Sequence, residues 1–555
     1  MKTTQRIVSV LLLLAMLFAL FASCSSGKKK DDKKEPGPTE KDNYMDISEH
    51  LILRPYSGSS KVAAAAGLLK EKLIKYTGSD MSMIVDLNVE KESNLEILVG
   101  LTNRQASKDA AEKLASVAEK EAFIIDIKDS KIAIIGTSDD DTILAVKYFI
   151  NNFVKTSPKN NRILLENGDR TILEKTGKIL YMSDKMDAIV LDKKTTIFEP
   201  EPYYTNEYTY GKIIKLEHQP EEKNNGILFA TNENTLGSPW DLYRSDDDGD
   251  TWQTLEKIRD EHNIGLLSGY QSYIYELPEA MGDYPKGTIL FAGCSYGTDK
   301  TAIYLTASTD LGKTWTSLGN VVEGGGYNQG GWSSDGVWEP VLMYENGRLY
   351  CCFSDETENG EGEEHIGGHN QKLSYRYTDN LKRWTKTKDM VALGSARPGM
   401  IALTKMGNGK WALAFEYCLN GCPINIKFAD TLDSWDASDK GTTIETPEKK
   451  RFGSGPAIAW TPNGGDNGTL LLTACTNMNQ YTGSTKCDLF ISFDYGETFI
   501  SIDNPIPIKN NSKVRSGYSP GFYVDKNGDV YYVNDPELAP GASCGKLVFA
   551  KLKIY

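Results

Sequence analysis

An eight-residue motif recurs at wide, regular intervals along the second part of the chain. It reads SDDDGDTW from Ser245, STDLGKTW from Ser308 and SFDYGETF from Ser492, with weaker copies, YTDNLKRW and FADTLDSW, from Tyr377 and Phe428. Successive copies lie about 62 residues apart, so about six such units fit between residue 176 and residue 555. Short strands repeated at this period are typical of propeller blades. We therefore expect residues 176–555 to form an all-β six-bladed propeller.

The motif itself has the composition of a turn. Its aspartate can accept hydrogen bonds from its own turn, its glycine can take a positive φ, and its final aromatic residue can fill the gap between blades. It falls between the third and fourth strands of each blade, on the face opposite the channel mouth. The acids of the motif are thus excluded from catalysis. One blade lacks a copy, and we expect an early strand near KTTIFEP, residues 194–200, to close the ring against the last strands of the chain.

Residues 45–175 follow a different pattern, in which helical and strand segments mix. Apolar residues at spacings of three and four predict helices over 62–78 and 140–154, and apolar runs predict strands within 94–101, 122–137 and 162–166. This predicts a small α+β domain in front of the propeller. ILVGLTNRQAS and IAIIGTSDDDTILAVKYF in it resemble the accessory domain that precedes the barrel of several β-hexosaminidases and α-glucuronidases, which implies a non-catalytic packing module.

The first residues predict export. Lys2 and Arg6 precede an apolar run, and residues 1–23 have the pattern of a signal peptide. The small residues in front of Cys24 resemble the lipobox of a bacterial lipoprotein, which implies a lipid anchor at Cys24 in the bacterial cell envelope. A short transmembrane anchor is the alternative, which the brevity of the apolar run disfavours. Residues 24–44 are polar and predict a flexible tether.

The amino-acid composition limits the kinds of molecule that the protein is expected to bind. The net charge is −14 and a lysine-rich spacer is the one basic run, so a nucleic-acid partner is not expected. With 29 Tyr and 9 Trp, an oligo- or polysaccharide is the expected ligand of a monomeric protein. The five histidines are not spaced for a zinc site, so no metal or cofactor is expected. In an exported chain, Cys418 and Cys422 across the CLNGC loop are a plausible disulfide.

Strand polarity selects the side chains at the channel mouth, where the start of a first strand meets the end of a second. In the third blade, PVLMYE and LYCCFSDE bring Glu339 to the mouth, together with Asp355 and Glu356. In the fourth blade, MIALTKM and WALAFEYC bring Arg397 and Glu416. The first and sixth blades add the following residues: Lys212, Glu233, Arg515, Tyr518 and Asp535.

Two glutamates on neighbouring blades suit glycoside hydrolysis, which needs an acid for the leaving oxygen and a carboxylate that attacks carbon or activates water. We expect Trp338 to raise the pKa of Glu339 by desolvation, and Glu416 to stay ionised near Arg397. Retention requires about 5 to 5.5 Å between the two carboxyl groups. The same argument leaves Asp355, Glu356 and Glu233 as rivals, and a single acid at a strand end is often a solvated rim charge.

The order of motifs in the propeller resembles the exo-α-1,5-L-arabinanase family, within the sialidase superfamily of Asp-box, or BNR-repeat, propellers. The motifs are YGKIIKLEHQP, GVWEPVLMYENGRLYCCFSDE, ARPGMIALTKMGNGKWALAFEYC and SGYSPGFYVDKNGDVYYVND. The resemblance spans residues 200–555. It implies an exo-acting retaining hydrolase of an arabinan-like glycan, with Glu339 as acid/base and Glu416 as nucleophile. The remaining mouth residues are candidate substrate contacts: Trp338, Arg397, Asp355, Glu356, Lys212, Arg515 and Tyr518.

The chain departs from the sialidases proper at the first blade. Their Arg-Ile-Pro motif is replaced by Gly211, Lys212 and Ile213, so the arginine clamp for a substrate carboxylate is incomplete. Arg397 and Arg515 remain, and GYSPGF resembles the sialidase tyrosine motif, with Tyr518 at the nucleophile position. An exo-α-sialidase is therefore one alternative. A glycan-binding surface lipoprotein without turnover is the other.

Overall fold

The computed structural model describes residues 44–88, 91–118, 120–157, 160–164, 169–185, 187–200, 208–234, 239–263, 265–326, 335–357, 371–394, 396–419, 421–477, 488–508, 517–536 and 545–555. The predicted signal peptide, Cys24, nearly all of the tether and Arg515 lie outside these residues. None of the helices that the described ranges contain is long and apolar enough to cross a membrane.

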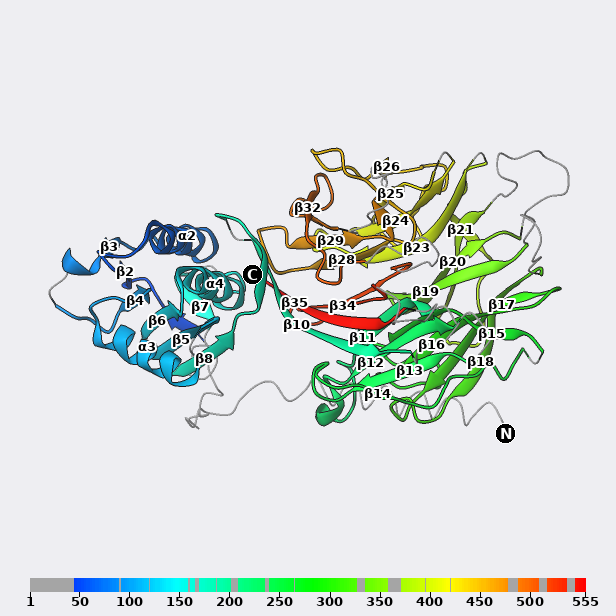
Figure 1. The fold of residues 1–555 in the computed structure, drawn as a ribbon, viewed down its shortest axis with the longest axis horizontal. Helices are drawn as coiled ribbons and strands as arrows, with labels where there is room; N and C mark the ends of the chain where they lie inside the picture. Colours follow the sequence, from blue (N-terminus) through cyan, green and yellow to red (C-terminus); the bar gives the residue numbers. More distant parts are fainter. Residues whose placement is uncertain are drawn as a thin grey trace, which may run out of the picture. The chain divides into compact units, whose positions relative to one another are not determined.

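The first part of the chain forms a mixed six-stranded sheet with three main helices (Figure 1). The sheet order is β3-β2-β4-β6-β5-β8, in which β3, β2, β4 and β6 run parallel. The strands are β2 (Leu51–Arg54), β3 (Met83–Val85), β4 (Glu96–Val99), β5 (Ala122–Lys128), β6 (Lys131–Gly136) and β8 (Arg170–Lys175). The helices are α2 (Ser60–Thr77), α3 (Gln105–Val117) and α4 (Asp139–Phe149), the last continued by a π-helical turn over Ile150–Val154. A short pair, β1 (Tyr44–Asp46) and β7 (Arg162–Leu164), completes this layer.

Local signals explain the two helices that periodicity predicts. The side chain of Ser59 accepts the N–H of Val62 at the start of α2, and Gly78 ends it at φ +80°. Ser138 caps α4 in the same way, through the N–H of Asp141. Helix α3 was not predicted, because it contributes few apolar residues to the core and ends at Ala118 without a glycine signal.

Six sheets form the propeller, and the first strand of each lines the axis (Figure 1). The first blade consists of β11 (Tyr208–Lys215), β12 (Leu228–Asn234), β13 (Asp241–Ser245) and β14 (Gln253–Thr254). The second consists of β15 (Leu267–Glu276), β16 (Ile289–Tyr296), β17 (Thr301–Ser308) and β18 (Thr316–Gly324). The third consists of β19 (Val337–Glu345), β20 (Arg348–Asp355), β21 (Lys372–Thr378) and β22 (Lys388–Val391). Blades four and five are β23 (Arg397–Lys405), β24 (Trp411–Cys418), β25 (Ile424–Ala429), β26 (Thr442–Thr443); and β28 (Ala457–Thr461), β29 (Thr469–Thr473), β31 (Leu489–Ser492), β32 (Ile500–Ile502), beside the small pair β27 (Phe452–Gly453) and β30 (Thr476–Asn477). The six-bladed fold predicted from the repeat is confirmed.

The sixth blade joins the two ends of the propeller segment. Its order is β33 (Gly521–Val524), β34 (Val530–Asn534), β35 (Leu547–Ile554), β10 (Ala188–Phe198) and β9 (Lys178–Met182). Strand β10 pairs antiparallel with β35 from Ile189 opposite Ile554 to Phe198 opposite Leu547. This confirms the predicted closing strand. Ala188, Val190 and Tyr555 also pack into the core of the α+β layer, so the two parts share buried residues.

Three repeat motifs make the predicted turn contacts. In the first, Asp247 accepts hydrogen bonds from the N–H and hydroxyl of Thr251, and Gly249 has φ +86°. Asp310 and Asp494 repeat these bonds with Thr314 and Thr498. The weaker copy at Tyr377 differs, because Asn380 rather than Asp379 accepts the turn N–H groups.

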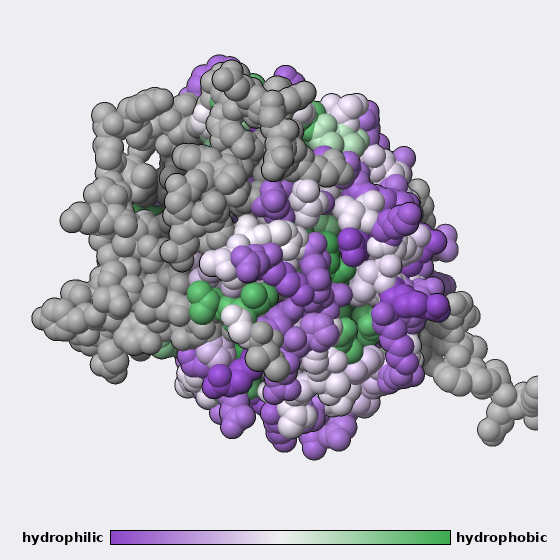
Figure 2. Space-filling view, turned by 90° about the vertical axis from the view of Figure 1, so that its right-hand side faces the viewer, coloured by the Kyte–Doolittle hydropathy of each residue, from purple (hydrophilic) through white to green (hydrophobic). Residues whose placement is uncertain are grey.

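The α+β layer contacts the fifth blade through the loop between β28 and β29. The ammonium of Lys155 donates to the carbonyl oxygens of Pro462 and Gly465, each at 2.7 Å. Asp466 accepts the hydroxyl of Tyr76 and pairs with Lys75. Figure 2 shows one face of the molecule, on which polar side chains predominate and the apolar ones lie in separate small patches, as is ordinary for a surface in water.

Candidate active site

A left-handed residue interrupts the axial edge of every blade. The six residues, one per blade, are Tyr210, Gln271, Glu339, Met400, Gly455 and Ser519, with φ between +48° and +63°. In the first four blades it coincides with a shift in register between the first and second strands, which is a β-bulge. Positive φ is costly for residues with a side chain and is concentrated at functional sites. We call these six residues the bulge ring.

The bulge ring turns backbone N–H groups towards carboxylates at the mouth. The N–H of Met400 donates to Oε2 of Glu339 at 2.9 Å, and the N–H of Gly455 donates to Oε1 of Glu416 at 2.7 Å. The N–H of Gln271 donates to Oε2 of Glu233 at 3.1 Å. An ordinary strand would use these groups in its own ladder. The bulges therefore create the hydrogen bonds that orient the acids.

Glu339 is partly buried and its two oxygens have different partners. Oε2 accepts the hydroxyl of Ser354 at 2.6 Å as well as the N–H of Met400. Oε1 lies 3.4 Å from the hydroxyl of Tyr210, which also reaches Sδ of Met400 at 3.3 Å. Because Oε2 is already an acceptor twice, a proton on Glu339 belongs on Oε1.

Glu416 lies two residues before the end of β24 and is only 4% exposed. Its Oε1 accepts the N–H of Gly455 and, at 3.3 Å, the hydroxyl of Tyr518. Gly399 lies opposite it in the ladder, and a Cβ there would approach Oε2 of Glu416 to 3.7 Å. The next residue, Met400, donates its N–H to Glu339, so the dipeptide Gly399–Met400 contacts both glutamates.

Burial raises the pKa of both glutamates. For Glu416 it rises to about 7, chiefly through desolvation and then through the charge of Glu339, against the lowering effect of Gly455, Arg397 and Tyr518. The pKa of Glu339 is also raised by desolvation, against Ser354 and Met400. The expectation that Glu416 stays fully ionised at neutral pH is therefore wrong. Two buried carboxyl groups in mutual electrostatic contact resist carrying two charges, so near neutrality the pair retains a proton.

Arg397 and Trp338 meet at Glu356 rather than at the predicted partners. The guanidinium of Arg397 donates to Oε1 of Glu356 at 2.9 Å, and the indole N–H of Trp338 donates to Oε2 at 2.8 Å. Trp338 packs with Cys294 and Tyr296, since neighbours along a strand point to opposite faces. Arg397 still lowers the pKa of Glu416 by its charge and is 40% exposed. Glu356 is thus the counter-ion that holds Arg397 at the mouth.

Asp355 has a local role. Its Oδ1 accepts both the N–H and the hydroxyl of Thr357, which fixes the chain as it leaves β20. All three rivals to the glutamate pair thus have structural partners: Asp355 binds Thr357, Glu356 binds Arg397 and Trp338, and Glu233 accepts the N–H of Gln271.

A second group of charges lies on the opposite side of the ring. The ammonium of Lys212 donates to the carbonyl oxygen and hydroxyl of Ser519 at 2.9 and 3.0 Å, and burial lowers its pKa to about 7 against the charges of Glu233, Glu339 and Asp535. Asp535 is 2% exposed, and neither carboxyl oxygen has a hydrogen-bond partner in the part of the chain that the structure describes. Burial raises its pKa well above the usual range.

Sequence reasoning missed four residues that shape the site: Tyr210, Gln271, Ser354 and Met400. Gln271 accepts the N–H of Glu339 on its side-chain oxygen at 3.0 Å. Tyr210 crosses from the first blade to reach Glu339 and Met400 on the third and fourth. A positive φ at such residue types has no sequence signal. Ser354 alone was accessible to prediction, because it precedes Asp355 on the strand that was assigned to the mouth.

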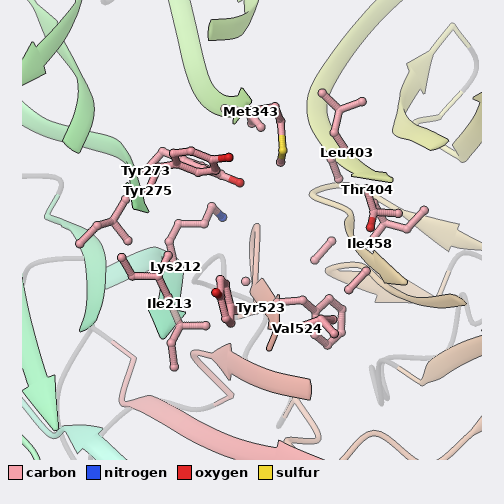
Figure 3. A pocket seen from close by; sticks show the side chains of 18 of the residues that line it. Lys212, Ile213, Tyr273, Tyr275, Met343, Leu403, Thr404, Ile458, Tyr523 and Val524 are labelled. Atoms are coloured by element: carbon pink, nitrogen blue, oxygen red, sulfur yellow. The ribbon is translucent and has the colours of Figure 1, made fainter. Parts of the chain in front are cut away.

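A cavity lies along the axis, and neither glutamate lines it. It measures about 350 Å³ and is lined by the first strands of all six blades. Figure 3 shows the amine of Lys212 entering it among Tyr273, Tyr275, Met343 and Tyr523. Its lining includes Ser519 of the bulge ring and residues just beyond the ring, for example Val341 and Ile401, but neither Glu339 nor Glu416. The candidate chemistry therefore lies on the mouth side of the ring.

The propeller architecture is shared with glycoside hydrolases of known structure. An α-L-arabinanase of Penicillium chrysogenum complexed with arabinobiose matches with a TM-score of 0.53 and 28% identity, over 64% of this chain and 97% of that one. An α-L-arabinofuranosidase of Fusarium graminearum with arabinobiose matches with a TM-score of 0.54 and 25% identity, over 65% and 97%. No family model matches the chain, and no curated protein matches its sequence.

The likeness to these two enzymes covers almost the whole of each of them and about two thirds of this chain. It supports a hydrolase at the level of the fold. Substrate and anchoring are matters for the proposal that follows.

Proposed function

We propose that the chain is an exo-acting, retaining glycoside hydrolase of an arabinan-like glycan, with Glu339 as acid/base and Glu416 as nucleophile. The observation that carries this is the placement of partly buried Glu339 and buried Glu416 on adjacent blades, each held by a bulge-ring N–H, with the charge of Glu339 raising the pKa of Glu416. The similar arabinanase and arabinofuranosidase structures carry arabinobiose, which favours an arabinofuranosyl substrate. Cys24 is proposed to attach the exported protein to a membrane.

The hydrogen bonds of Glu339 and Glu416 assign a different role to each of them. Oε1 of Glu339 carries the proton and passes it to the glycosidic oxygen, while Oε2 stays fixed by Ser354 and Met400. Glu416 attacks the anomeric carbon with Oε2, because Oε1 is held by Gly455 and Tyr518. The bond to the leaving oxygen breaks as the ester to Glu416 forms. Glu339 then takes a proton from water, which cleaves the ester and restores both carboxyl groups.

Tyr210 fits both protonation states of Glu339. When Glu339 is ionised, the tyrosine hydroxyl can donate to Oε1; when Oε1 is protonated, the hydroxyl can accept from it and donate to Sδ of Met400 instead. A retaining cycle needs Glu339 in both states in turn. Tyr210 is thus a positioning residue for the acid/base.

A sialidase is the second candidate, and one contact favours it. The hydroxyl of Tyr518 lies 3.3 Å from Oε1 of Glu416, which is the pairing that a tyrosine nucleophile with a carboxylate base requires. Against it, Arg397 is already paired with Glu356, and Lys212 binds backbone and hydroxyl oxygens of the sixth blade. A carboxylate clamp therefore lacks two of its expected cations.

The test is a panel of debranched arabinan, an aryl α-L-arabinofuranoside and a fluorogenic sialoside, each with wild type, Glu339→Gln, Glu416→Gln and Tyr518→Phe. We expect hydrolysis of the first two substrates, its loss in both glutamate variants and a smaller loss in Tyr518→Phe. Hydrolysis of the sialoside alone, abolished by Tyr518→Phe, would establish the second candidate. Binding of arabinan without hydrolysis of any substrate would identify a glycan-binding protein.

A further inference from the structure

Three potential metal ligands meet at the end of β24. One carboxylate oxygen of Glu416 and the sulfurs of Cys418 and Cys422 all lie within 4.8 Å of one another. The two cysteines form a disulfide, as the sequence predicted. Sulfur in a disulfide carries no thiolate charge and is a poor ligand, so the cluster cannot hold a metal ion in this form.

The fold keeps these groups together independently of the disulfide. Glu416 and Cys418 are two residues apart on one strand and therefore face the same side. The N–H of Tyr417 donates to the carbonyl of Pro423 at 2.8 Å, which closes the base of the loop. The carbonyl of Cys422 accepts the N–H of Ser454 at 3.1 Å. Opening the disulfide therefore leaves both sulfurs at the end of β24.

The free oxygen of Glu416 is the one that faces the sulfurs. Oε1 is occupied by Gly455 and Tyr518, whereas Oε2 lies 3.5 Å from Sγ of Cys418. Zinc takes thiolate ligands at about 2.3 Å and carboxylate oxygens at about 2.0 to 2.2 Å, so its donors lie about 3.5 to 4 Å apart in a tetrahedral site. The distance from Oε2 to Sγ of Cys418 already fits this geometry, and the two sulfurs move apart to reach it once their bond is reduced. The charge of Glu339 favours a cation here, and that of Arg397 opposes it.

We propose that reduction of the Cys418–Cys422 disulfide creates a zinc-binding site formed by the two cysteine thiolates and the Glu416 carboxylate. A phosphine reductant supplies two electrons and becomes the phosphine oxide with oxygen from water, while the water protons convert the disulfide into two thiols. Zinc then displaces the two thiol protons to solvent. Three protein ligands leave the fourth position of the ion open to water.

The consequence for hydrolysis rests on the proposed function. An ion on Oε2 occupies the atom assigned to nucleophilic attack, so the reduced, zinc-loaded protein is inactive. Exchange with an added small-molecule disulfide, which takes up the two electrons and leaves as two thiols, re-forms the Cys418–Cys422 bond, releases the metal and returns Glu416 to the reaction. The oxidation state of the disulfide thereby controls whether an inhibitory zinc ion can bind at Glu416.

The experiment measures zinc binding directly, by competition with a chromophoric chelator. Full-length protein is reduced anaerobically with a water-soluble phosphine, desalted and compared with the oxidised protein, with Cys418→Ser/Cys422→Ser and with reduced Glu416→Gln. The double variant is the matched control, because it keeps the other described cysteines, Cys294, Cys351, Cys352 and Cys475. Circular dichroism checks that each sample is folded, and cadmium in place of zinc reports thiolate ligation through its ultraviolet charge-transfer band.

We expect the reduced protein to bind about one more zinc ion per chain than the oxidised protein or the double variant, and Glu416→Gln to bind it at least about tenfold more weakly. Equal binding by the reduced protein and the double variant would overturn the inference, as would unchanged affinity in Glu416→Gln. Both results are read without substrate, so they stand apart from any failure of the proposed hydrolase activity. If hydrolysis is observed, it should fall at least about tenfold on adding zinc to the reduced protein and should not fall in the oxidised one.

Discussion

Glu416 and Glu233 occupy the same place on opposite blades of the propeller. Each lies in a second strand opposite the residue before a bulge, and each accepts the N–H of the bulge residue in the next blade. Both are almost fully buried. Yet Glu416 interacts with another glutamate and an arginine, whereas Glu233 lies near Lys212 and Asp535. The fold supplies the position, and the neighbouring blade determines what a carboxylate there can do.

The difference lies in the third blade. Its bulge residue is Glu339, so the fourth blade has a second acid beside Glu416. The equivalent bulge residue in front of Glu233, on the sixth blade, is Ser519, so a hydroxyl takes the place that Glu339 has in front of Glu416. Catalysis by an acid and a nucleophile is therefore expected only between blades three and four.

The largest predicted effect is a difference in kcat between Glu416→Gln and Glu233→Gln. Glu416→Gln should lower kcat on an aryl α-L-arabinofuranoside by about 1,000-fold or more, because the nucleophile is lost. Glu233→Gln should lower it by less than about tenfold, because it removes only a charge across the ring. Steady-state kinetics of the two purified variants decide the matter. Equal losses in both would reverse the assignment of Glu233.

Stability should change in the opposite sense to activity. The pKa of Glu416 is raised to about 7, so its charge destabilises the folded state at pH 8, and this penalty disappears as the pH falls towards 5. Glu416→Gln should raise the free energy of unfolding by about 2 kcal/mol at pH 8 and by much less at pH 5. Denaturant unfolding at both pH values measures this.

Glu345 provides the matched control. It is equally buried, but hydrogen bonds from Leu432, Lys405 and Trp411 lower its pKa despite desolvation. Glu345→Gln should therefore destabilise the protein at pH 8. Stabilisation in both variants would contradict the assigned difference in charge environment.

The pH profile should be tied to Glu416. Because attack needs the carboxylate and its pKa is about 7, kcat/KM should fall about tenfold per pH unit below 7. Rates from pH 5 to 8 with the aryl substrate test this. A flat profile down to pH 5 would show that Glu416 stays ionised and that burial does not raise its pKa.

The smallest effect concerns the hydroxyl of Tyr210. Tyr210→Phe removes one hydrogen bond to Glu339, and we expect kcat to fall about five- to tenfold with little change in KM. Tyr523→Phe is the control, since its hydroxyl binds Glu217 beyond the ring. An effect confined to KM, or equal effects in both variants, would remove Tyr210 from the acid/base machinery.

Much of the fold was predictable because the repeat fixes the position of each blade. The glycine and aspartate of the motif determine one turn per blade, and the pattern of apolar residues then places the other strands. The ring closure by β10 followed from the blade that lacks a motif. Helix α3 could not be predicted in this way, because most of its surface is exposed and only Ser107, Ala110 and Leu114 are buried.

The site was predictable only as far as strand ends could be counted. Counting placed Glu339, Glu416, Arg397 and Tyr518 at the mouth, where the structure brings them together. It could not foresee that Trp338 would point to Glu356, because a bulge changes which side chains face the axis. The raised pKa of Glu416 depends on burial by the fifth and sixth blades, which are distant in the sequence.

The pairing of β10 with β35 has a consequence for synthesis. Strand β10 leaves the ribosome long before its partner exists, so throughout that interval it is an unpaired edge able to join another chain. Blades one to five can assemble meanwhile, but the ring and part of the α+β core stay open until Tyr555 arrives. A nascent chain stalled before β35 is therefore the form most exposed to aggregation, and the speed at which β35 is translated becomes part of how this protein folds.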